Sequence, residues 1–216
     1  MLSLSFRRNV TRLDAGTLTT LMSALLTAEA ARLNMPPNAV VVSQALNDAD
    51  GGLDARIDEV PVAPDNLLPS GLVGFQFKAR KSKTFSNEEL RAELAKPGPT
   101  RILQQRGTYV LVVQADLNDQ QRSLIEQRLA EEASLIAADP QCLVWDATAI
   151  EAFAQHHVAV VEGLELESFE AVRALPEIEQ SLRIAERPYE ADDRRREAIE
   201  QIRSRATGSG SDELDG

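Results

Sequence analysis

Cysteine and aromatic residues are scarce in this sequence. The single cysteine, Cys142, excludes an internal disulfide and a zinc site built on cysteines, so a cytoplasmic location is expected. Aromatic residues make up 4% of the 216 residues and hydrophobic residues 43%, which predicts a mainly aliphatic core. Cys142 itself lies in an apolar stretch and is expected to be a small core residue.

Long apolar runs are also missing. No stretch approaches the roughly 20 apolar residues that a membrane-spanning helix needs. The first residues lack the apolar region of a signal peptide, and no phosphate-binding glycine loop, zinc-ligand cluster or internal repeat is present. We therefore expect a protein without a membrane partner.

Alternating strand and helix patterns predict an α/β fold. Helical spacing of apolar residues over 15–33 follows Asp14, a helix-start residue, and ends before two prolines. Later helices are expected at 86–94, about 119–137 and 147–156, and strands at 39–44, 53–62, 72–79, 108–114 and 142–145. Strands that alternate with helices predict an α/β sandwich with a mixed sheet, in which 72–79 is central.

Composition divides the chain into three parts. Residues 1–160 have the length of one domain. Residues 161–205 carry charges at helical spacing and predict a charged helical extension, and 206–216 have the composition of a flexible linker or tail.

Positive charge is concentrated in one stretch, although the net charge is −11. Leu72 to Arg106 contains eight basic and three acidic residues, whereas Val161 to the end contains fifteen acidic and eight basic ones. Contacts with a phosphate backbone need a local positive surface rather than a basic protein. The stretch favours a nucleic-acid partner; a solvated face of mixed charge is the alternative.

Two short motifs combine residue types that bind metal and phosphate. Asp54 follows Gly51-Gly52-Leu53, and about twenty residues later an apolar run contains Gln76 and Lys78. Residues two apart on a strand point to the same face. If Asp54 lies on the neighbouring strand, a carboxylate, an amide carbonyl and an ammonium surround one point. That set suits a Mg²⁺ ion together with a phosphate.

This arrangement resembles the PD-(D/E)xK nuclease superfamily, and within it the Mrr-like restriction endonuclease branch, which has Gln-x-Lys on the second strand. The resemblance covers about residues 15–160 and implies a restriction-endonuclease-like α/β/α sandwich with a central mixed sheet. It implies that Asp54 and Gln76 bind Mg²⁺ or Mn²⁺ with the backbone carbonyl of Phe77. Lys78 would orient the attacking water or stabilise charge on the phosphoryl oxygens.

A further carboxylate would complete such a site. Glu29 is the only acidic residue between Asp14 and Asp48, and in many members of the superfamily the first helix contributes an acid. We include Glu29 among the catalytic residues; the alternative is a place on the solvent face of its helix. Asp50 is the competing candidate, but its place before two glycines suits a turn residue equally well.

Other polar residues are assigned more simply. The candidates for contact with DNA phosphates are Lys78, Arg80, Lys81 and Lys83. Adjacent residues on a helix point roughly 100° apart, so His156 and His157 are not expected to share a metal ion. We expect them at a helix C-terminus, where a protonatable group suits the helix dipole.

The resemblance implies a Mg²⁺-dependent endonuclease that acts on DNA, expected to be double-stranded, as the effector domain of a prokaryotic antiphage defence system. A larger sensor domain or protein beyond the C-terminus and a homo-oligomer are expected with it. Gln in place of Glu and the acidic net charge support an alternative, a catalytically inactive nuclease-fold module for DNA binding or protein interaction. A third hypothesis is an adaptor that works through its charged C-terminal helices.

Overall fold

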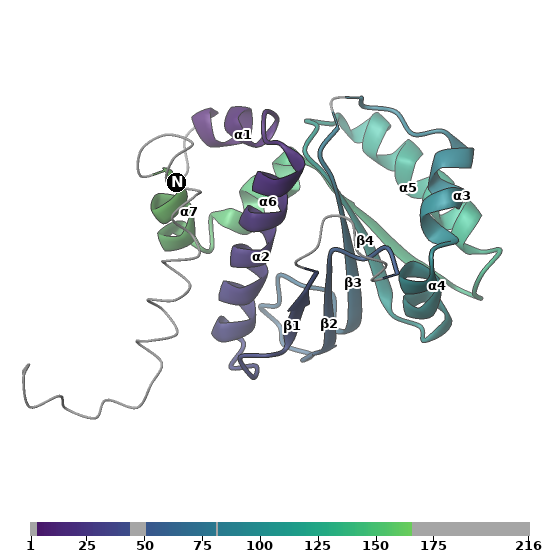
Figure 1. Cartoon of the computed structure of the whole chain (residues 1–216), viewed down its shortest axis with the longest axis horizontal. Coiled ribbons are helices and arrows are strands. Elements are labelled where there is room, and N and C mark those ends of the chain that lie inside the picture. Colours follow the sequence, from purple (N-terminus) through teal and green to yellow (C-terminus); the bar gives the residue numbers. More distant parts are fainter. Residues whose placement is uncertain (1–3, 44–50, 81, 166–216) are drawn as a thin grey trace, which may run out of the picture. The chain divides into compact units, whose positions relative to one another are not determined.

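The computed structural model describes residues 4–43, 51–80 and 82–165, which fold into a five-stranded sheet with helices on both faces (Figure 1). The elements follow one another as α1 (Leu4–Val10), α2 (Ala15–Arg32), β1 (Val40–Val42), β2 (Ala55–Val60), β3 (Gly71–Lys78), α3 (Asn87–Leu94), α4 (Pro97–Gln104), β4 (Thr108–Val113), α5 (Asp119–Ala133), β5 (Gln141–Trp145), α6 (Ala147–Ala154) and α7 (Val158–Glu165). The prediction of an α/β fold with a mixed sheet is confirmed.

The strands lie in the order in which they occur in the chain, from β1 to β5. β1, β2 and β3 pair antiparallel, whereas β3, β4 and β5 pair parallel. Parallel neighbours need long crossover connections, and α3 with α4, and then α5, provide them. β3 is central, as its apolar sequence predicts, and β4 is buried along its whole length.

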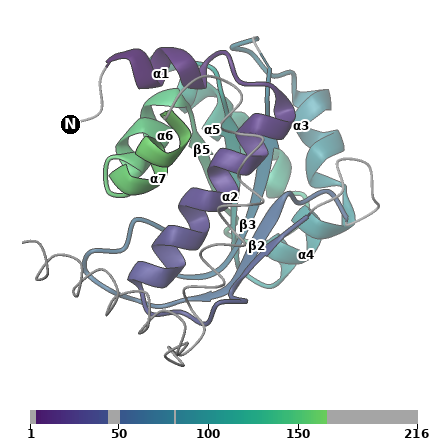
Figure 2. The ribbon, with the colours of Figure 1, turned by 60° about the vertical axis from the view of Figure 1, so that its left-hand side comes forward.

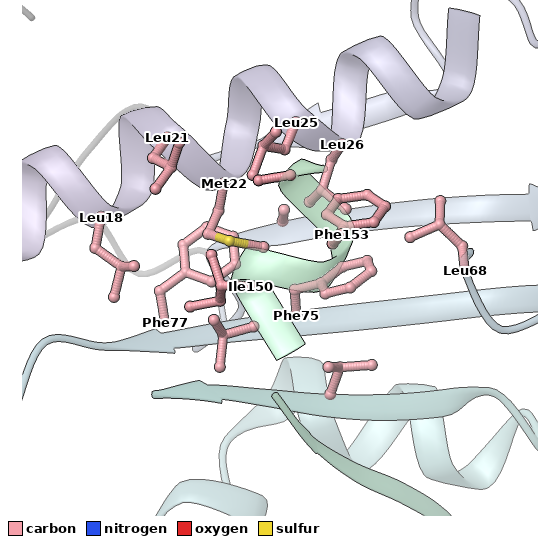
Figure 3. Packing of buried hydrophobic residues seen from close by; sticks show 14 of the residues in the cluster. Leu18, Leu21, Met22, Leu25, Leu26, Leu68, Phe75, Phe77, Ile150 and Phe153 are labelled. Atoms are coloured by element: carbon pink, nitrogen blue, oxygen red, sulfur yellow. The ribbon is translucent and has the colours of Figure 1, made fainter. Parts of the chain in front are cut away.

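Two apolar layers cover the two faces of the sheet (Figure 2). On one face, α2 and α6 pack against Phe75 and Phe77 of β3 (Figure 3). On the other, α3, α4 and α5 pack against Tyr109, Leu111 and Val113 of β4. Because side chains alternate along a strand, Gln76 and Lys78 of β3 point to the opposite face, which α3 and α4 cover.

The helix starts follow the capping chemistry of the sequence. The Asp14 carboxylate accepts the backbone N–H of Thr17 at 2.7 Å at the start of α2. Ser86 and Glu89 exchange two hydrogen bonds in a capping box at the start of α3. Asp146 caps α6 through the N–H of Ala149. These three starts confirm the sequence predictions.

Three helices were not expected from the sequence. α4 begins at Pro97 in the stretch Pro-Gly-Pro-Thr, whose composition is typical of a turn. Pro is nevertheless well suited to the first position of a helix. α1 precedes the predicted first helix. α7 crosses the domain boundary expected after residue 160 and places Val161 in the apolar layer between α2 and the sheet. Beyond residue 165 the predicted extension and tail lie outside the described residues. No helix among the described residues is long and apolar enough to cross a membrane.

Candidate active site on the α3 and α4 face of the sheet

Gln76 and Lys78 lie side by side on the face of β3 that α3 and α4 cover. A single glutamate, Glu93 in the last turn of α3, contacts both of them. Its Oε2 accepts from Gln76 Nε2 at 2.6 Å, and its Oε1 is 2.7 Å from Lys78 Nζ. The prediction that these two residues share a face is therefore confirmed.

Glu93 also binds a second ammonium. Lys96 Nζ, from the junction between α3 and α4, lies 2.6 Å from Glu93 Oε2. Burial tends to raise the pKa of Glu93, but the hydrogen bonds and charges of Lys78 and Lys96 outweigh it and hold that pKa below its usual value. The carboxylate is therefore ionised at neutral pH and is shared by two cations.

Asp54 lies immediately before β2 and against the same part of β3. Its carboxylate Oδ2 accepts the backbone N–H of Phe77 at 2.6 Å, and its own N–H donates to the carbonyl of Phe75 at 2.9 Å. The N–H and C=O of one strand residue point to the same side. The Phe77 carbonyl therefore points to the side of β3 from which Asp54 comes, as the proposed metal set requires.

The two glycines before Asp54 bring its loop to the α3–α4 junction. Gly51 and Gly52 have φ of +78° and +86°, which favour glycine. The Gly51 carbonyl accepts the N–H of Gly98 at 2.6 Å. A Cβ on Gly52 would lie 2.3 Å from the Cδ of Lys96. The glycine pair thus allows the Asp54 loop to pack against the segment that carries Lys96.

A buried tyrosine fixes the orientation of Gln76. The hydroxyl of Tyr109, on β4, donates to Gln76 Oε1 at 2.6 Å. Burial raises the pKa of Tyr109 well above its usual value, and the charges of Glu93 and Asp54 add to this effect. A carboxylate can only accept hydrogen bonds, so the Gln76 amide must turn its NH₂ group to Glu93 and its oxygen to Tyr109.

Glu29 does not join this cluster, which corrects the expectation that the first helix supplies its acid. It lies on α2, on the opposite face of the sheet, and it is 0% exposed, so the solvent-facing alternative is wrong as well. Arg32 donates to both of its oxygens at 2.8 Å, the N–H of Leu67 donates to Oε1, and His157 Nε2 lies 3.0 Å from Oε2.

The two histidines also differ from one another. His157 is buried between α6 and α7 and binds Glu29, while His156 is exposed. Neither the spacing nor the helix end predicted this pairing, because residues 29 and 157 are brought together only by the packing of α7 near α2. Asp50, the competing candidate for a site acid, lies outside the described residues.

The basic residues expected to contact DNA are largely engaged with neighbouring acids. Lys78 pairs with Glu93, and Arg80 pairs with Glu89 at 3.0 Å while its guanidinium lies 4.3 Å from the ring centroid of Phe85. Lys83 is exposed, and Lys81 lies outside the described residues. Arginine keeps further N–H donors when one is used, so Arg80 retains the capacity to contact a phosphate.

Sequence reasoning missed Glu93, Lys96 and Tyr109. One signal was available: Glu93 follows the buried Leu90 by three residues, and this spacing puts both on the same face of a helix. Lys96 and Tyr109 carry no comparable signal, because their contacts depend on how α3, β3 and β4 pack together.

The oxygen donors of the cluster suit Mg²⁺. The described residues contain no group of three or more His, Cys, Asp and Glu side chains able to hold a metal ion. Mg²⁺, however, is commonly held by one or two carboxylates, with waters and substrate phosphates completing its shell. Asp54, the amide oxygen of Gln76 and the Phe77 carbonyl provide hard oxygen ligands of that kind. Comparisons of the chain with protein-family models, curated proteins and solved structures find no match.

Proposed function

We propose that the protein is a Mg²⁺-dependent endonuclease that hydrolyses phosphodiester bonds in DNA. The observation that carries the proposal is the convergence of Asp54, Gln76 and Lys78 at one end of β3. The Asp54 carboxylate accepts the N–H of Phe77, the residue between Gln76 and Lys78. The side chains of Gln76 and Lys78 both contact the carboxylate of Glu93. The resemblance to Mrr-like nucleases rests on these same three residues.

The ion would be held by the Asp54 carboxylate, the Phe77 carbonyl and the second lone pair of the Gln76 side-chain oxygen, whose first lone pair accepts from Tyr109. When bound, Mg²⁺ supplies charge stabilisation at the phosphoryl oxygens and a more acidic water. In hydrolysis the water oxygen forms a bond to phosphorus and gives a proton to solvent. The bond from phosphorus to one sugar oxygen breaks, and that oxygen takes up a proton from solvent and leaves as a hydroxyl group. The oxygen donors fit the ion, and the neutral Gln76 leaves Asp54 as the only anion in this set.

Lys78 acts on the phosphate or on the attacking water. Its ammonium has three donors and uses one of them on Glu93 Oε1. The side chain is partly exposed, so the remaining donors can reach a group that approaches from solvent. Arg80 and Lys83 follow β3 in the chain, and their positive side chains are the further contacts proposed for the DNA backbone.

The setting proposed for this activity is an effector domain in prokaryotic antiphage defence, linked to a larger sensor and active as an oligomer. This part of the proposal is supported by the resemblance and by the composition of residues 161–216.

A nicking assay on supercoiled plasmid with Mg²⁺ tests the proposal. Asp54→Ala and Lys78→Ala should each lower the rate at least about a hundredfold, the usual loss for a positioned catalytic group. Asp58→Ala and Arg101→Ala are matched controls, because these exposed residues lie on β2 and α4 outside the cluster. Unchanged cleavage by both site variants would contradict the proposal.

A module that binds DNA without cutting it is the second candidate. Two observations favour it: Gln76 is neutral, and Lys78 already pairs with Glu93. This candidate predicts a DNA mobility shift but no nicking at any Mg²⁺ or Mn²⁺ concentration. A titration of both ions with supercoiled DNA separates the two functions.

A further inference from the structure

We propose that Glu93 supplies the second carboxylate of the metal site, and that Gln76 is the residue that holds it there. The inference rests on the proposed nuclease function and names a ligand that the Asp54, Gln76 and Phe77 set does not contain.

The first step concerns the position of Glu93. Its carboxylate reaches the same two β3 residues that the nuclease proposal uses, although it comes from α3. Asp54 approaches that part of β3 from the β2 side. Two carboxylates from different elements therefore lie around one polar centre.

The second step concerns Gln76. The Tyr109 hydroxyl fixes the oxygen of the Gln76 amide, so that the NH₂ group of the amide points at Glu93 Oε2. The buried amide thereby holds the Glu93 carboxylate in position. A glutamate at this position would place a second carboxylate within hydrogen-bond distance of Glu93. Two ionised carboxylates at that distance repel, and one of them takes up a proton. The neutral residue on β3 is therefore the one that a carboxylate from α3 requires.

The third step concerns charge. In the structure described here, the single negative charge of Glu93 faces two ammonium groups, those of Lys78 and Lys96. Three donors use three of the about four lone-pair directions of the Glu93 carboxylate. One direction remains for a metal ion, which would take the place of an ammonium group as a positive partner of this carboxylate.

Binding of Mn²⁺ alone, followed by the loss of its free-ion electron paramagnetic resonance signal, tests the assignment without measuring activity. Changes in the partners of metal ligands typically cost 10- to 100-fold in affinity, so removal of a ligand should cost at least about tenfold. Glu93→Gln should weaken Mn²⁺ binding by that amount, as should Asp54→Asn. Glu89→Gln is the matched control on the same helix: it changes another ion-paired carboxylate, and affinity should stay unchanged.

A double exchange tests the role of Gln76 and guards against a merely structural effect of Glu93→Gln. In Gln76→Glu with Glu93→Gln, the acid and the amide trade places and the net charge is unchanged. We expect this double variant to recover most of the Mn²⁺ affinity that Glu93→Gln loses. Circular dichroism of each variant verifies that the measured protein is folded.

The outcomes separate the inference from the proposed function. If Glu93→Gln binds Mn²⁺ as tightly as the unchanged protein while Asp54→Asn does not, Glu93 only positions the two lysines. The inference then fails, while the nuclease proposal stands. If the unchanged protein neither binds Mn²⁺ nor nicks plasmid with it, both fail.

Discussion

The two faces of the sheet each hold a glutamate among several hydrogen-bond donors, and the two glutamates differ in their access to solvent. Glu29, on the α2 face, is 0% exposed and its partners Arg32, His157 and the N–H of Leu67 surround it. Glu93, on the α3 face, has 21% of its side chain exposed, and its partners Lys78 and Lys96 are 26% and 40% exposed.

This difference indicates what each cluster does. A fully buried ion pair has no room for a ligand, and it resists disruption because loss of one partner leaves an uncompensated charge. A partly exposed cluster of mixed charge can exchange its internal partners for an ion or a phosphate at lower cost. We therefore assign the Glu29 cluster to stability and the Glu93 cluster to binding, and each prediction below tests that division.

The largest effect is expected from Glu29→Ala. Removal of this carboxylate leaves His157 and the Leu67 N–H without their partner in the core. Breaking a buried pair costs several kcal/mol, and because Arg32 reaches solvent we expect a loss of about 3 kcal/mol in the free energy of unfolding. Urea denaturation measures this loss, with Glu93→Gln as the comparison.

Glu93→Gln should lose less stability, and plasmid nicking per folded molecule should be lost only in the Glu93 variant. The reverse pattern, with Glu29→Ala stable and inactive, would show that the two clusters have been assigned to the wrong roles.

Tyr109→Phe should have an intermediate effect on stability and a specific one on the site. The hydroxyl is removed, and the buried Gln76 oxygen loses its donor, which costs about 1 to 3 kcal/mol. Gln76 is then free to turn its amide, so Mn²⁺ affinity should fall as well. Urea denaturation and Mn²⁺ titration measure the two effects. Lost stability with unchanged Mn²⁺ affinity would show that the orientation of Gln76 does not matter for the ion.

The sequence predicted the α/β fold and its mixed sheet because its local signals agree with its packing. Apolar strands, and capping residues such as Ser86 before α3, place most elements within a few residues. The helix that begins at Pro97 was missed because Pro and Gly in succession signal a turn more strongly than a helix. Local chemistry therefore accounts for most elements, whereas α1, α4 and the helix α7 that crosses residue 160 were not expected.

The site was predicted only where it lies on consecutive strands. Gln76 and Lys78 share a face because of strand geometry, and Asp54 precedes the adjacent strand. The acid that contacts them could not be chosen by sequence position, because Glu29 and Glu93 both lie on helices that pack on the sheet. Only the alternation of β3, which directs Phe75 and Phe77 towards α2, decides that Glu93 and not Glu29 meets the polar residues.

The smallest effect is the pH dependence of stability that His157 gives the α2 face. Burial lowers the pKa of His157, and this outweighs the opposing influence of Glu29, while the charges of Arg32 and His156 act with burial. The edge of the Phe153 ring also lies against the imidazole, with centroids 5.3 Å apart. Since the pKa of His157 in the folded state lies below its unfolded value of about 6.5, the unfolded state takes up the proton first. The stability that His157 contributes is thus present above that pH and is lost as the pH falls through the folded-state pKa.

Urea denaturation between pH 7.5 and pH 5 measures this dependence. The unchanged protein should lose stability as the pH falls, and His157→Gln, which keeps a donor for Glu29 but has no proton to take up, should lose less. His156→Gln changes the exposed neighbour and should follow the unchanged protein. An equal loss of stability in all three proteins would mean that protonation of the buried histidine is not coupled to folding. The stabilising role of the Glu29 cluster would then depend on Arg32 and the Leu67 N–H alone.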